Sequence, residues 1–96
     1  MNRIYFEVFL EKMMALYAQK TPNDNDTIKD LVEAAKELAK YGERRIALEN
    51  LLENVFENNI ILDDELLDAA DKAFGENASN YDKELLKDIA IMKNKD

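Results

Sequence analysis

The side chains of this chain that could do chemistry are carboxylates, and they are concentrated in one interval. Positions 46 to 71 hold eight acidic residues and neither a lysine nor an arginine. The thirteen basic residues all lie outside this interval and balance the remaining acidic ones, so the net charge of −8 belongs to the interval. A surface of one sign attracts molecules of the opposite sign over distance. We therefore expect a cationic partner at this part of the chain.

The spacing of these residues places them on helix faces. Three glutamates stand four positions apart and three asparagines follow them by one position, which makes two parallel ladders on one helix. Like charges at that spacing destabilise a helix by about 0.2–0.5 kcal/mol per pair, so stability alone does not explain them. Asparagine amides can bind a partner's backbone as well as its charged groups. Three aspartates of the next helix complete the predicted binding surface. The predicted partner-binding residues are Glu49, Asn50, Glu53, Asn54, Glu57, Asn58, Asp64, Asp68 and Asp71.

The acidic residues could also have a simpler role. A charged face that only keeps an acidic protein in solution is the plainest alternative, and it remains open. Catalysis is not expected, because the chain has no histidine and no cysteine, which removes the commonest general base and thiolate metal ligands. The clusters also lack the glycine and the final glutamate of a calcium-binding loop. We predict no catalytic residue, no cofactor, no metal and, given the negative charge, no direct contact with nucleic acid.

The elements that must position these residues are helices. Apolar residues recur every three or four positions, and the chain has only two glycines and one proline. We predict one all-α domain over residues 1–96, a compact bundle of four to five short helices. The expected helices span about residues 3–19, 26–41, 43–58, 63–74 and 79–92. Because the connections are short, successive helices should pack as mostly antiparallel neighbours.

Several local features follow from the same pattern. Residues 21–26 are expected to form a loop, with a capping box between Thr27 and Asp30 starting the second helix. Phe56 is expected to face the core, and residues 60–62 to plug it between helices. Asp63 is expected to cap the fourth helix and Gly75 to end it. The spacing of Ser79 and Asp82 predicts a capping box for the fifth helix.

The beginning of the chain does not resemble a secretory signal. Its apolar residues are interrupted by Glu7, Glu11 and Lys12, and no small-residue cleavage site follows. No apolar run approaches the ~20 residues that cross a membrane. We expect a cytoplasmic protein without membrane contact, which agrees with the missing cysteines.

The stretch from Tyr41 to Glu57, followed by Ile61 to Leu66, carries a resemblance to a known group. It is similar to the small helical immunity proteins of bacterial polymorphic-toxin and contact-dependent growth inhibition systems, the MafI-like group. The matching features are Gly42-Glu43, the run Ala47-Leu48-Glu49-x-Leu51, and Glu57 before an apolar turn. They cover about a third of the chain.

The resemblance implies a cytoplasmic, non-enzymatic protein that binds and neutralises the C-terminal toxin domain of a cognate effector. In that group the toxins are often nucleases, including RNases of the EndoU type, and nucleases need a positive surface to hold phosphates. A helical adaptor or regulatory subunit is the alternative, such as a homodimer formed through an exposed face of the first helix with Phe6, Phe9, Met13 and Met14. The sequence leaves the choice between monomer and dimer open.

Overall fold

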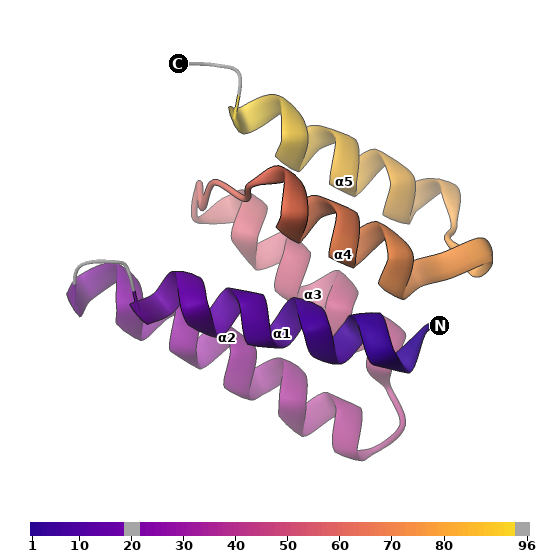
Figure 1. Ribbon diagram of the computed structural model, residues 1–96, viewed down its shortest axis with the longest axis horizontal. Coiled ribbons are helices and arrows are strands. Elements are labelled where there is room, and N and C mark those ends of the chain that lie inside the picture. The colour runs from indigo at the N-terminus through magenta and orange to yellow at the C-terminus, as the bar shows by residue number, and fades with distance from the viewer. Residues whose placement is uncertain (19–21, 94–96) are drawn as a thin grey trace.

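The structure, a computed structural model, describes residues 1–18 and 22–93, and the regular secondary structure within them is helical, without a strand (Figure 1). This confirms the all-α prediction. The elements are α1 (Arg3–Ala18), α2 (Pro22–Lys40), α3 (Arg44–Glu57), α4 (Asp64–Phe74), the 3-10 helix η1 (Gly75–Asn77) and α5 (Asn80–Lys93).

The helices form two layers closed along one edge by α5. In Figure 1, α1 and α4 lie side by side in front, α2 and α3 lie behind them, and α5 runs along the top in contact with both α3 and α4. Consecutive helices alternate in direction, as predicted. The expectation that every successive pair packs together is wrong for α3 and α4, which do not pack along each other. Instead, α5 packs against both of them.

The segment between α3 and α4 explains why α4 does not pack beside α3. Asn59 adopts a left-handed backbone conformation, with φ of 55°, and turns the chain out of α3. Leu62 is then completely buried and Ile60 packs on the core, while Ile61 is exposed. Two of the three residues expected to plug the core therefore do so. Their burial anchors the crossing of the chain from the rear layer to the front layer.

One continuous core joins all five α-helices. The stripes predicted from apolar spacing supply it, and the largest completely buried apolar side chains come from α1, α2, α3, the α3–α4 segment and α5. They are Phe6, Phe9, Met13, Ile28, Val32, Leu48, Leu51, Leu52, Val55, Leu62 and Ile89. Burial of this apolar surface is the main force that holds the helices together.

The start of α2 differs from the prediction. The expected loop is wrong for residues 22–26, which are helical, while Thr21 lies outside the described residues. Proline is well suited to the first position of a helix, because its fixed φ matches the helix and the first N–H has no partner within it. Thr27 and Asp30 consequently lie inside α2, so the capping box predicted there is wrong.

The helix ends predicted at Asp63, Gly75 and Ser79 are confirmed, whereas the predicted end of the first helix at residue 19 lies outside the described residues. The Oδ1 atom of Asp63 accepts a 2.8 Å hydrogen bond from the backbone N–H of Leu66. Gly75 follows α4 with φ of 68°, a conformation that side chains with a Cβ rarely adopt. Ser79 Oγ accepts from the N–H of Asp82 at 3.1 Å, and Asp82 Oδ2 accepts from the N–H of Ser79 at 3.0 Å. This is the reciprocal geometry of a capping box.

The Asp63 cap gives a first test of the fold. We expect Asp63→Ala to lower the free energy of unfolding by about 1 kcal/mol, because the N–H of Leu66 loses its acceptor. Asp63→Asn is the matched control, since asparagine caps helices about as well as aspartate. Urea denaturation monitored by circular dichroism measures both variants. Equal stability of the two variants would contradict this role of the cap.

Candidate functional site: an acidic groove between α3 and α5

A groove with a volume of about 270 Å³ lies between α3 and α5. Among the described residues, four carboxylates and three apolar side chains line it, and neither a lysine nor an arginine does. The lining residues are Glu53, Phe56 and Glu57 from α3 and Tyr81, Glu84, Leu85 and Asp88 from α5. The acidic interval of the sequence thus contributes only one wall of the groove, and the other wall comes from the last helix.

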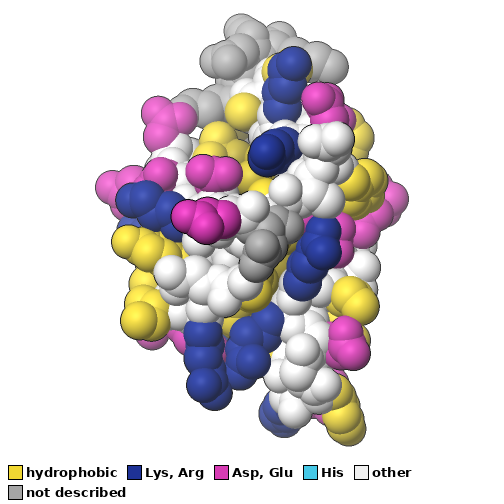
Figure 2. All heavy atoms as spheres, turned by 90° about the vertical axis from the view of Figure 1, so that its right-hand side faces the viewer, with side chains coloured by type: hydrophobic (Ala, Val, Ile, Leu, Met, Phe, Trp, Pro, Cys, Tyr) yellow, Lys and Arg dark blue, Asp and Glu magenta, His cyan; other side chains and the backbone are white. Residues whose placement is uncertain are grey.

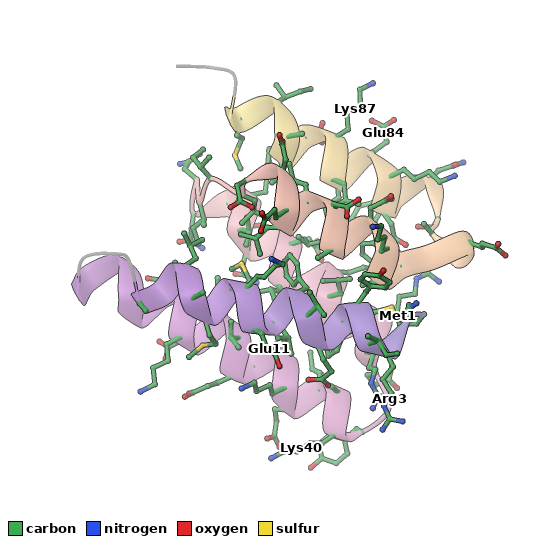
Figure 3. All side chains as sticks on the ribbon, in the orientation of Figure 1. Met1, Arg3, Glu11, Lys40, Glu84 and Lys87 are labelled. Carbon is green, nitrogen blue, oxygen red and sulfur yellow. The ribbon has the colours of Figure 1, made fainter. Side chains whose placement is uncertain are left out.

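Helical spacing explains why these side chains converge. The α3 residues follow Glu53 at three and four positions, and those of α5 follow Tyr81 at three, four and seven positions, so each set forms one stripe on its helix. The packing of α3 against α5 places the two stripes opposite each other. Figure 3 shows Glu84 projecting from α5 away from the bundle. Lys87 projects from the same part of α5 but does not line the groove.

Two aromatic side chains in the groove are half exposed. The exposed fraction is 41% for Phe56 and 52% for Tyr81. The prediction that Phe56 faces the core is wrong, because its neighbour Val55 occupies the core stripe of α3 and Phe56 falls on the flank. Exposed aromatic residues surrounded by polar groups are typical of protein-binding sites.

A hydrogen bond ties the two walls together. The hydroxyl of Tyr81 donates to Glu53 Oε2 at 2.8 Å. This bond, together with the nearby carboxylates, raises the pKa of Tyr81. The phenol therefore keeps its proton and holds the Glu53 carboxylate at the groove wall.

A cluster of charged residues around the buried Asp82 adjoins the groove. Arg45 donates to Asp82 Oδ2 at 3.1 Å, and its Nε lies 4.0 Å from Glu49 Oε1. Burial raises the pKa of Glu49 to about 6, and contact with Asp82 adds to this shift. Burial alone would raise the pKa of Asp82, but hydrogen bonds from Glu49, Ser79 and Arg45 lower it below its usual value. Glu49 therefore belongs to the α3–α5 junction and not to a solvated face.

The predicted residues of α3 consequently have different environments. Glu53 and Glu57 line the groove, as one wall of it. The Nδ2 atoms of Asn54 and Asn58 donate to the backbone carbonyls of Asn50 and Asn54, both at 2.8 Å. Their amides thus turn back onto their own helix, although each keeps further hydrogen-bonding capacity.

The predicted residues of α4 lie on another part of the surface. Asp68 pairs with Lys72 at 3.0 Å, and Lys72 lies 5.4 Å from the ring centroid of Tyr5 on α1. Asp71 lines a shallow hollow with Tyr5 and Lys72, and Asp64 is exposed in the first turn of α4. The structure therefore does not gather the nine predicted residues into one surface.

The groove also includes residues that the sequence did not single out. Glu84 and Asp88 are a like-charge pair four positions apart, which is the same signal as the glutamate ladder of α3. Their signal was hidden because Lys83 and Lys87 cancel their charge in any count along the chain. Only the packing of the helices shows that these lysines do not line the groove.

Basic residues gather at the edge opposite α5. Arg3 and Lys40 project there in Figure 3, and a hollow nearby is lined by Lys36, Lys40 and Arg44 together with Glu7. On the face at the right of Figure 1, Lys and Arg side chains run from the top to the bottom, with acidic side chains among them (Figure 2). The excess of basic residues is therefore local to this hollow.

Within residues 1–18 and 22–93, no group of three or more acidic side chains is arranged to hold a metal ion. None of the described helices has both the length and the apolar character needed to cross a membrane. Comparisons with protein-family models, curated proteins and solved structures find no match.

Proposed function

We propose that this chain is a non-enzymatic, cytoplasmic immunity protein whose α3–α5 groove binds the cationic substrate-binding surface of a nuclease-type toxin domain. The observation that carries the proposal is the composition of the groove. Four carboxylates surround two half-exposed aromatic side chains, and no lysine or arginine within the described part of the chain lines the site to neutralise them. Occupation of the groove by the toxin would cover the surface that the toxin needs for its substrate.

The chemistry of the groove favours arginine or lysine side chains. A cation is attracted to the face of an aromatic ring, and a guanidinium group forms paired hydrogen bonds with a carboxylate. Phe56 and Tyr81 offer the first interaction, and the carboxylates around them offer the second. Surfaces that hold phosphates are rich in these same basic side chains. The resemblance to immunity proteins, which are paired with toxins, supports this choice of partner.

The alternative, a subunit that dimerises through α1, has less support. It was based on an exposed apolar face of the first helix. Phe6, Phe9 and Met13 are completely buried in the bundle, and Met14 packs against the core. The described part of α1 therefore offers no such face, and the α3–α5 groove is the better candidate for an interface.

Co-expression tests the proposed function. We expect the neighbouring upstream gene to encode a large secreted protein whose basic C-terminal domain is toxic when expressed alone. Co-expression of this chain should restore growth, and the purified pair should form a stable complex. A harmless C-terminal domain, or toxicity that this chain does not relieve, would contradict the proposal.

Neutral variants test the groove itself. We expect Glu84→Gln with Asp88→Asn to slow association with the toxin domain about tenfold at low salt, because electrostatic steering weakens. The same variant should reduce the dependence of the association rate on salt. Asp68→Asn with Asp71→Asn removes equal charge from α4 and is the matched control. Stopped-flow measurements that find equal association rates for the two variants would show that the groove is not the contact surface.

A further inference from the structure

We infer that Glu49 and Asp82 share one proton across the α3–α5 junction in mildly acidic solution, and that a cationic partner in the adjacent groove displaces this proton. The shared proton is a property of the free chain. Its displacement rests on the proposed function. Together they would make partner binding sensitive to pH.

The geometry of Asp82 calls for a donor. Its side chain is completely buried, and its Oδ2 atom accepts hydrogen bonds from Arg45 and from the N–H of Ser79. Its Oδ1 atom is also buried, but no nitrogen or hydroxyl group of the described residues donates to it. A buried carboxylate oxygen without a donor is strongly unfavourable. The carboxyl group of Glu49, with which Asp82 is in hydrogen-bonding contact, fills this role when it carries a proton.

The two carboxyl groups of the pair carry one more negative charge than Arg45 can balance. Arg45 and Glu53 act on Glu49 from α3, and Asp82 and Tyr81 face it from α5. Within residues 1–18 and 22–93, the ion pairs and hydrogen bonds of the two carboxyl groups come from α3, α5 and the turn before α5, and not from α1, α2 or α4. Two carboxylates that meet around a single arginine hold a proton between them up to a higher pH than an isolated carboxyl group does. The raised pKa of Glu49, about 6, agrees with this assignment.

The pair is coupled to the groove through its nearest neighbours. Glu53, one helical turn after Glu49, lines the groove, and Tyr81 precedes Asp82 in α5. A positive charge that enters the groove favours the ionised form of Glu49 and so expels its proton. Binding of a cation should therefore strengthen as the pH rises through about 6.

The sign of the effect on stability follows from the direction of the shift. The pKa of Glu49 in the folded chain is about 6, above its ordinary value of 4.5. The folded state therefore binds this proton more tightly than the unfolded state does. The resulting stabilisation is complete below pH 4.5 and is lost as the pH rises through about 6.

The free chain tests the shared proton. In carbon-13 NMR titrations of the full chain, we expect the Glu49 carboxyl to titrate near pH 6. Glu49→Gln replaces a carboxyl donor, which is lost on ionisation, by an amide donor that is present at every pH. It should therefore raise the unfolding temperature at about pH 7.5 and leave it nearly unchanged at about pH 4.5. Glu57→Gln, an exposed change on the same helix, should retain the wild-type dependence on pH. A Glu49 midpoint near 4.5, with equal pH profiles for the two variants, would overturn the inference.

A decaarginine peptide tests the displacement. Calorimetric titrations at about pH 6, in buffers of different ionisation enthalpy, should show proton release on binding to the wild-type chain and none for Glu49→Gln. Binding without proton release would overturn the displacement and leave groove docking intact. If decaarginine binds the Glu84→Gln, Asp88→Asn variant as tightly as it binds the wild-type chain, the groove is not its binding site. The NMR titration of the free chain tests the shared proton independently of this result.

Discussion

Phe56→Ala should weaken binding of the toxin domain by about 2 kcal/mol, or roughly thirtyfold, and should leave the fold almost as stable as before. Phe56 is 41% exposed in the free chain and stands among carboxylates at the groove. An aromatic residue in that setting is typical of binding hot spots, because it buries apolar area and attracts cations at a low cost in side-chain entropy. Charged residues around it should mainly affect the rate of association.

Ile46 provides the matched control for this substitution. It lies on α3, is 47% exposed and does not line the groove. Ile46→Ala should therefore change the affinity by less than about 0.5 kcal/mol. Calorimetry or surface plasmon resonance with the toxin domain compares the two variants. If both variants bind the toxin domain with wild-type affinity, Phe56 does not contribute to binding of the partner.

Phe9→Ala should have the largest effect on stability, a loss of about 3–5 kcal/mol of the free energy of unfolding. The Phe9 side chain is completely buried in the shared core, so its removal leaves a cavity that the surrounding helices cannot fully close. A loss of this size is a large part of the total of about 5–15 kcal/mol expected for a small domain.

Ile4 tests whether this loss depends on burial. It is an apolar residue on the same helix, but it is 73% exposed. Ile4→Ala should change the free energy of unfolding by about 0.5 kcal/mol at most. Urea denaturation measures both variants. Similar losses for Phe9→Ala and Ile4→Ala would contradict the position of α1 in the bundle.

Much of the fold could be predicted because the apolar period is local information. The stripe of Leu48, Leu51, Leu52 and Val55 identified the inner face of α3, and the structure buries all four. Helix ends were predictable where a side chain caps them, as Asp63 does for α4. The start of α2 was not, because proline can either interrupt a helix or begin one.

The groove could be predicted only in part, because it depends on which helices become neighbours. Glu53 and Glu57 were recognised from their spacing, but Glu84 and Asp88 come from a helix that is distant in the sequence. Short connections suggested that α4 would lie beside α3, whereas α5 takes that place. A charge count along the chain cannot show such an arrangement in space.

The burial of a charged residue was equally invisible to a count of charges. Glu49 belongs to the same ladder as Glu53 and Glu57, and nothing in the spacing distinguishes it from them. Its environment is set by Asp82, which the sequence identified only as part of a capping box. The Asp82 carboxylate thus caps its own helix and holds a neighbouring helix in place, through Arg45.

Four carboxylates line the groove of α3 and α5, whereas the hollow lined by Lys36, Lys40 and Arg44 holds one acidic residue, Glu7. This difference contributes an electric dipole moment whose negative end lies along the groove. The field of an approaching cation exerts a torque on such a dipole and not only a pull. We expect the molecule to rotate its α5 edge toward the partner before contact. A larger fraction of collisions then occurs in the productive orientation.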